Sequence, residues 1–168
     1  ISIRNRILNK QIRRYLILVG ILMIFWLTIR IIKWRFLSVT DPMGRYLWYA
    51  YYIPMIMIPL FGVFIVQYVG KREDYVIPKK FNLLLIPSVA LLVFIFTNDI
   101  HRCVFEFPEG IINYNNIYDY KWGFFIVVAW FVSLGFYFTV MLLVKSRVPG
   151  SRSFQRLPAV IMVLAAGL

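Results

Sequence analysis

The residues best suited to chemistry are gathered in one short stretch, residues 96–108, which reads FTNDIHRCVFEFP. This stretch contains the only histidine and the only cysteine of the sequence, His101 and Cys103. Asp99 stands two residues before the histidine, where a long uncharged apolar run ends. Ionisable groups beside a hydrophobic span are costly to keep, so this stretch is the first candidate for a functional site.

An acid–base pair made of Asp99 and His101 would need both side chains on one face. At a spacing of two residues they lie on different faces of a continuing helix. Zinc protease motifs need two histidines, and no phosphate-binding glycine loop, nucleophile elbow or CxxC pair is present. Cys103 has no partner for a disulfide and is interpreted as a packing residue. We therefore predict no catalytic residue, no metal and no cofactor in this chain.

The elements that must position these residues are long apolar segments. Hydrophobic residues make up 61% of the chain, whereas soluble domains contain about 45–50%. A transmembrane helix needs about 20 mostly apolar residues. The candidate spans are 15–34, 47–69, 81–100, 122–144 and 157–168. We predict an all-α polytopic membrane helical bundle, a single domain over 1–168, with four complete spans and a fifth truncated at the chain end.

The basic residues predict an orientation for this bundle. Thirteen of them lie in the leading tail and in the second and fourth joints, against six in the first and third joints. The positive-inside rule then places residues 1–14, 70–80 and 145–156 in the cytoplasm and residues 35–46 and 101–121 outside. Because the net charge of +12 is confined to joints, we expect the lipid bilayer as partner and no nucleic acid.

Charged residues near the outer ends of the spans suggest a contact between helices. Arg30 and Asp99 lie at similar predicted depth, so we hypothesise an Arg30–Asp99 ion pair with His101 nearby. Protonation of His101 would add positive charge there, and such a site could sense pH, a metal or an anion. A structural clamp is the alternative. Glu106, Glu109 and the loop 113–120 either contact a ligand or form a solvated hairpin.

An aromatic cluster, WYAYY at residues 48–52, precedes the apolar part of the second span. It is typical of the aromatic belt at a membrane interface. A cage for a cationic ligand is the alternative.

Three stretches carry a family resemblance: RYLWYAYYIPMIMIPL (45–60), TNDIHRCVFEFP (97–108) and YKWGFFIVVAW (120–130). They resemble the seven-span N-terminal membrane sensor region of bacterial sensor histidine kinases. In that family a TN-D/P-x-H motif closes one span, and here it falls on Thr97, Asn98, Asp99 and His101. The element that opens the next span falls on Tyr120, Gly123, Phe124, Phe125 and Trp130, with phenylalanines where the family has tyrosines.

The resemblance implies the sensory input region of a two-component system in a bacterial cell membrane. One span would precede Ile1, and a C-terminal cytoplasmic kinase module would follow Leu168. It further implies a homodimer and an unknown small ligand, with enzymatic activity confined to the kinase module. The ligand or switch candidates are Arg30, Asp99, His101, Glu106 and Glu109. A small membrane transporter or channel subunit, or a lipid-modifying membrane enzyme, remains the alternative.

Overall fold

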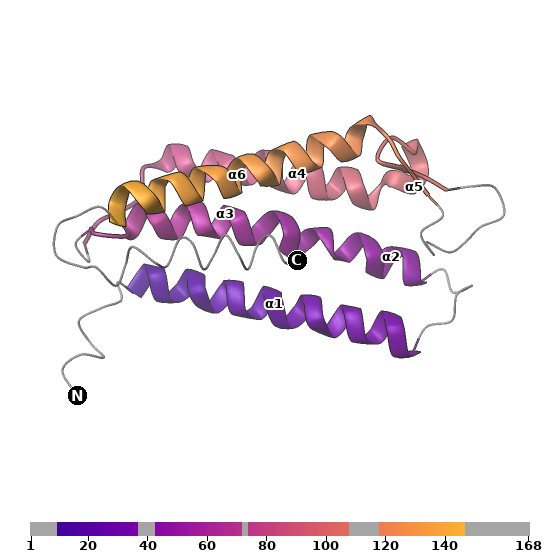
Figure 1. Cartoon of the computed structure of the whole chain (residues 1–168), viewed down its shortest axis with the longest axis horizontal. Coiled ribbons are helices and arrows are strands. Elements are labelled where there is room, and N and C mark those ends of the chain that lie inside the picture. The colour runs from indigo at the N-terminus through magenta and orange to yellow at the C-terminus, as the bar shows by residue number, and fades with distance from the viewer. Residues whose placement is uncertain (1–9, 37–42, 72–73, 108–117, 147–168) are drawn as a thin grey trace.

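The computed structural model describes residues 10–36, 43–71, 74–107 and 118–146 (Figure 1). Within these ranges, four helical segments are long and apolar enough to cross a membrane. They are Lys10–Arg35, Met43–Tyr68, Lys79–Phe96 and Trp122–Lys145. The predicted all-α membrane bundle is confirmed, and these segments overlap the first four predicted spans. The predicted fifth span, residues 157–168, lies outside the described residues.

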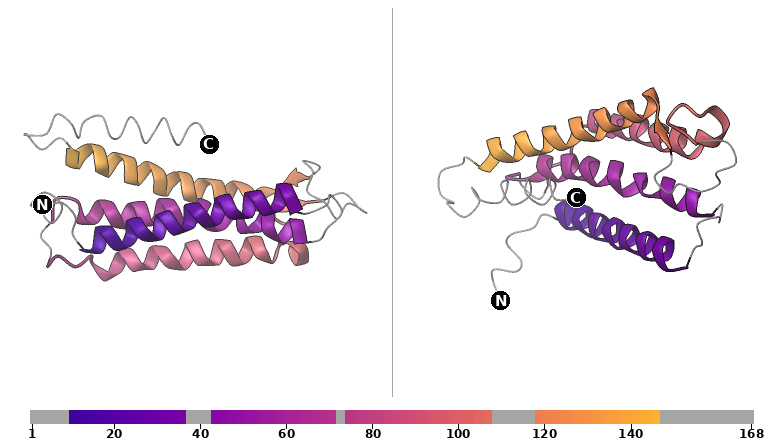
Figure 2. Two further views of the ribbon diagram at one scale, coloured as in Figure 1. Left: turned by 90° about the horizontal axis from the view of Figure 1, so that it is seen from below. Right: turned by 45° about the vertical axis from the view of Figure 1, so that its right-hand side comes forward.

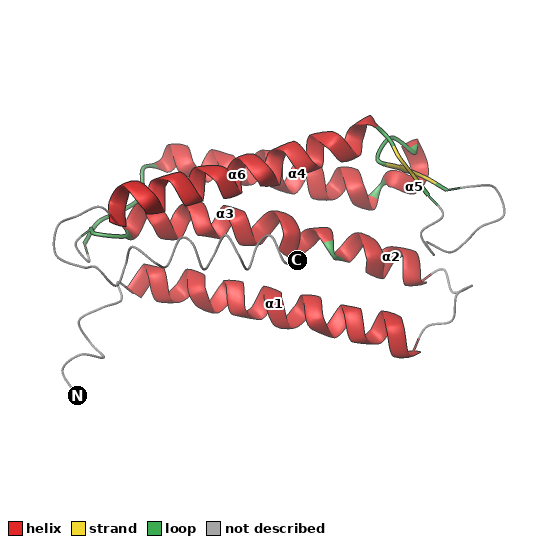
Figure 3. Cartoon of the chain, viewed as in Figure 1, coloured by secondary structure: helices red, strands yellow, loops and turns green. Residues whose placement is uncertain are grey.

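The first and fourth segments are single helices, whereas the second and third each consist of two helical elements (Figure 3). In chain order, the elements are α1 (Lys10–Phe36), α2 (Met43–Ala50), α3 (Tyr52–Tyr68), the 3₁₀-helix η1 (Lys79–Leu84), α4 (Leu85–Phe96), α5 (Asn98–His101), β1 (Phe105–Glu106), β2 (Asp119–Tyr120) and α6 (Trp122–Ser146). Pro54 lies in the first turn of α3, where its missing N–H leaves no helical hydrogen bond unmade. The helical backbone therefore resumes only one residue after α2 ends.

The long helices lie side by side along the length of the bundle, with α3 in the middle (Figures 1 and 2). Helix α3 packs against α1, α4 and α6. Half of the most apolar window of the second segment, which contains α3, is buried, compared with 6% in the first segment and 11% in the third and fourth. The outer helices thus direct most of their apolar side chains outward, as expected for surfaces that face lipid or further spans.

Strands β1 and β2 pair antiparallel, with Phe105 opposite Tyr120, and together with α5 they close one end of the bundle. We call this the hairpin end. A core cluster beneath it includes Trp48, Tyr49 and Tyr52, which are all buried. The interpretation of these three residues as an interface belt is therefore wrong, because their rings pack against Phe105 inside the bundle.

Candidate functional site

Asn98 is the centre of the hairpin end. It is fully buried, and its Oδ1 accepts hydrogen bonds from the backbone N–H groups of Val104 and Phe105, each at 3.0 Å. Its Nδ2 donates to the carbonyl oxygen of Phe105 at 2.9 Å and to the hydroxyl of Tyr49 at 3.2 Å. All four hydrogen-bonding positions of the amide are used, as burial requires.

The backbone between α4 and β1 turns sharply to place Asn98 in this position. Thr97 ends α4, and its Oγ1 donates to the Val93 carbonyl one turn back at 2.8 Å. Arg102 then ends α5 in the left-handed conformation, with φ of 51°, and its N–H donates to the carbonyl of Asn98 at 2.7 Å. The chain reverses there, so β1 runs back beside the Asn98 side chain.

A network of polar side chains extends from Asn98 to the surface. The Tyr49 hydroxyl accepts from Asn98 and donates to Oδ1 of Asp99 at 2.8 Å. Arg45, in the first turn of α2, donates from Nη1 to the same Asp99 oxygen at 3.2 Å. Its guanidinium also lies over the ring of Phe107, 4.2 Å from the ring centre. We call Arg45, Asp99, Tyr49 and Asn98 the polar network.

The predicted ion pair between Arg30 and Asp99 is wrong. Arg30 is exposed on α1, where its guanidinium lies 6.0 Å from the ring centre of Trp26, and the ion-pair partner of Asp99 is Arg45. Helix α1 packs chiefly against α3, whereas α2 packs against both α3 and α4. An arginine on α2 is therefore the one placed to reach the end of α4.

His101 has a structural position in the turn. Its Nδ1 accepts a hydrogen bond from the Cys103 backbone N–H at 3.0 Å. Since that nitrogen must be unprotonated, the proton of the neutral ring lies on Nε2, which donates to the Phe94 carbonyl at 2.9 Å. The imidazole also stacks on the Phe94 ring, with 4.4 Å between the ring centres. His101 therefore ties the turn to the last turn of α4.

The carboxylate of Glu106 forms an ion pair across the hairpin with Lys121. The hydrogen bond from Lys121 lowers the pKa of Glu106 and raises the pKa of Lys121. Tyr118 lies beside Tyr120, their hydroxyls 3.1 Å apart, and burial followed by this hydrogen bond raises the pKa of Tyr118 to about 12. Glu109, the other predicted acid, lies outside the described residues, as does most of the loop 113–120.

The polar network thus brings together two of the predicted residues, Asp99 and the motif residue Asn98, with two that the sequence reasoning did not select, Arg45 and Tyr49. The described ranges contain no cluster of three His, Cys, Asp or Glu side chains that could hold a metal ion. The arrangement is suited to holding helix ends together and to exchanging one charged partner for another. Arg45 and Tyr49 belong to the first of the three stretches that carry the family resemblance, and this membership could have identified them as candidate site residues.

The family model for the N-terminal 7TM region of histidine kinase matches residues 1–168. The chain belongs to this family. No curated protein and no solved structure matches it.

The polar network is therefore a feature of a histidine kinase sensor region, a membrane protein with an input role. The family resemblance inferred from the residue patterns is confirmed by this match. In the histidine kinase sensor region described here, the TNDIH motif forms the turn that carries the hairpin end. Its asparagine and histidine bind backbone groups, and its aspartate pairs with the charged side chain of Arg45.

Proposed function

We propose that this sensor region receives a stimulus at the hairpin end and relays it through α3 to a C-terminal cytoplasmic kinase module. The polar network carries the proposal, because it joins the first turn of α2 to the end of α4 and to the hairpin. A change in the partners of Asp99 would therefore affect α2, the end of α4 and the hairpin together.

The stimulus would act by changing the partners of the Asp99 carboxylate. The side chains of Asp99 and Arg45 remain 29% and 21% exposed, so ions and small ligands have access to the pair. A ligand that competes for either group weakens the contact between α2 and α4. A ligand shifts a two-state equilibrium only by its differential affinity for the two states. Here the two states are those with the Arg45–Asp99 contact intact and broken, and the ligand would bind more tightly to the state in which the contact is broken.

The central helix supports transmission from one end to the other. Only Tyr51 separates α2 from α3, and Tyr52, the first residue of α3, packs on Phe105 with ring centres 5.6 Å apart. A displacement of the hairpin therefore acts directly on the start of α3.

The opposite end of α3 is held by α6. The Lys145 ammonium group donates to the backbone carbonyls of Val66, Gln67 and Val69, where α3 ends. A cation at the carboxyl end of a helix satisfies carbonyls that have no helical partner and favours the helix dipole. The Gln67 amide also donates to the Tyr137 hydroxyl of α6 at 3.0 Å. Movement of α3 would therefore reach α6, which leads toward the C-terminus.

The distribution of basic residues supports the sidedness of this proposal. The hairpin end would face outward and the Lys145 end would face the cytoplasm, in a bacterial cell membrane. Two such chains would act as a homodimer, as the family resemblance implies. The small ligand would be recognised from outside, with Glu106 and Glu109 as further contacts.

The test is autophosphorylation of the kinase that contains this chain, reconstituted in lipid nanodiscs. Asp99→Asn removes the charge that Arg45 pairs with, and an interaction of ~0.5–1 kcal/mol corresponds to a shift of about two- to fivefold in basal activity. Asp119→Asn is the matched control, since it makes the same change in an exposed acid of β2 at the same end. Equal activities of the Asp99→Asn, Arg45→Gln and unchanged proteins would refute the proposal.

A further inference from the structure

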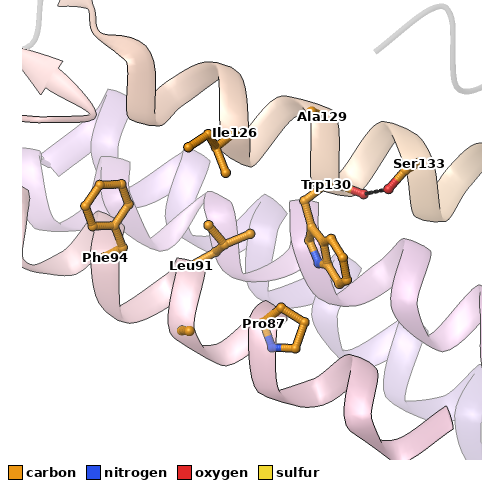
Figure 4. A pocket seen from close by; sticks show the side chains of 8 residues that line it. Pro87, Leu91, Phe94, Ile126, Ala129, Trp130 and Ser133 are labelled. Carbon is orange, nitrogen blue, oxygen red and sulfur yellow. Dashed lines mark hydrogen bonds between the residues drawn. The ribbon is translucent and has the colours of Figure 1, made fainter. Parts of the chain in front are cut away.

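An open apolar groove runs between α4 and α6 on the outside of the bundle (Figure 4). Its volume is about 670 Å³. The groove is bordered by Pro87, Ala90 and Phe94 of α4 and by Ile126, Ala129 and Trp130 of α6. It lies within two membrane-spanning segments, so it opens toward the lipid phase or toward a neighbouring span.

The groove exists because small side chains stand where larger ones would fill the space. Ala90 and Ala129 contribute only a methyl group each, and the ring of Pro87 is short. The polar groups nearby are already engaged: the Trp130 Nε1 donates to the Ser88 hydroxyl at 3.0 Å, and the Ser133 hydroxyl donates to the Trp130 carbonyl at 2.7 Å. The groove therefore offers an occupant almost only apolar surface.

Toward the hairpin end the groove terminates at Phe94. This ring lies between the imidazole of His101, at 4.4 Å, and the indole of Trp122, at 5.8 Å between ring centres. Arg102 follows His101 directly and is exposed. Among the described residues, its guanidinium has no hydrogen bond or ion pair, and its charge acts more weakly on the Glu106 carboxylate, whose pKa it helps to lower. Because Arg102 adjoins His101, whose ring stacks on Phe94, its backbone lies next to this end of the groove, where the span gives way to the hairpin.

We propose that the groove binds one acyl chain of an anionic phospholipid, whose headgroup contacts Arg102. Phe94 and Pro87 are seven positions apart, which corresponds to about 10 Å of helix leading inward from the level of the headgroups. An exposed cation near the end of an apolar groove complements an anionic amphiphile, whereas an apolar helix would offer no group to pair with that cation. Basic side chains near a membrane surface attract anionic lipids by about 1 kcal/mol each.

Photoactivatable lipids test this proposal. The protein is reconstituted in phosphatidylcholine nanodiscs that contain a minority of phosphatidylglycerol with a diazirine in its acyl chain. We expect labelling of the groove residues of α4 and α6 to exceed, by about fivefold, that obtained with the same diazirine on phosphatidylcholine. Arg102→Gln should abolish this preference, and Ala129→Phe should prevent labelling of the groove by either lipid.

Val132→Phe is the control for Ala129→Phe, since Val132 is exposed on α6 at nearly the same depth and does not border the groove. Its labelling should equal that of the unchanged protein. Equal labelling by the two lipids, or labelling spread evenly over exposed apolar residues of α1 and α6, would overturn the proposal. Exclusion of both lipids from the groove by another span or a second copy would do so as well. The measurement reports binding alone, so its outcome is independent of kinase output.

Discussion

The side chain of Asn98 acts toward Phe105 as a neighbouring strand would. It accepts the Phe105 N–H at 3.0 Å and donates to the Phe105 carbonyl at 2.9 Å. On the other side of β1, the backbone of Phe105 pairs with that of Tyr120. One buried amide thus takes the place of a third strand beside the two strands that the described residues form.

Replacing Asn98 by alanine should destabilise the hairpin end strongly. The change leaves the N–H groups of Val104 and Phe105 buried without acceptors, and each such group costs about 1–3 kcal/mol. We expect a loss of about 3 kcal/mol in the free energy of unfolding, measured by denaturant titration in detergent. Asn82→Ala, in an exposed position of η1, should change it by less than about 0.5 kcal/mol. Similar losses for both variants would contradict the role assigned to Asn98.

The hydrogen bonds of His101 predict a specific tautomer. Because the Cys103 N–H points at Nδ1, the neutral imidazole should carry its proton on Nε2. The chain has one histidine, so ¹⁵N NMR of selectively labelled protein gives a single pair of ring signals. A proton on Nδ1 of the neutral ring would show that the turn is built differently.

Gly123 and Gly135 form a matched pair on α6. A Cβ atom at Gly123 would lie 2.7 Å from the Phe94 ring and 2.8 Å from the Cys103 carbonyl oxygen, whereas none of the described atoms lies within 4 Å at Gly135. Gly123→Ala should therefore lower the unfolding free energy by about 1–3 kcal/mol, through the displacement of Phe94 or of the turn. Gly135→Ala should raise it by up to about 1 kcal/mol, because alanine favours helix. Thermal unfolding of the two variants decides, and equal shifts would argue against the close approach of α6 to the turn.

The Glu106–Lys121 pair predicts how the hairpin responds to pH. The folded pKa of Glu106 is lowered, first by the hydrogen bond from Lys121 and more weakly by Arg102. Its contribution to stability is present above the unfolded pKa of glutamate and is lost as pH falls through the lower folded value. The folded pKa of Lys121 is raised, so its contribution is lost as pH rises through that higher value. The pair therefore stabilises the hairpin fully at pH values between the ordinary pKa of glutamate and that of lysine.

The measurement is an NMR titration of the Glu106 carboxyl in the unchanged protein and in Lys121→Gln. The substitution should move the Glu106 pKa upward, toward its ordinary value. Asp119→Asn leaves the hydrogen bond intact and should have a smaller effect. An unchanged Glu106 pKa in Lys121→Gln would mean that the two side chains do not pair in solution.

The sequence was informative about the spans because apolar length alone selects membrane helices, and all four described segments overlap predicted ones. It also located the end of the third span near Thr97–His101, since polar and charged residues close the apolar run there. The partners of individual side chains could not be predicted in the same way.

The partner of Asp99 was missed because depth in the membrane does not determine which helices are neighbours. Arg30 and Arg45 both flank the first joint, and only the packing of α2 against α4 favours Arg45. The role of Asn98 was missed for a related reason. Its four hydrogen bonds depend on the backbone of β1 lying beside it, which follows from the turn at Arg102 and has no periodicity to detect.

The left-handed backbone of Arg102, with φ of 51°, has a practical consequence for protein engineering. This conformation costs an L-residue with a Cβ atom roughly 1–2 kcal/mol, whereas glycine adopts it without that cost. A screen for thermostability would therefore select Arg102→Gly, because the substitution raises the free energy of unfolding. That same substitution deletes the exposed cation beside the groove, so the most stable variant of this region would be a poor reporter of its lipid preferences.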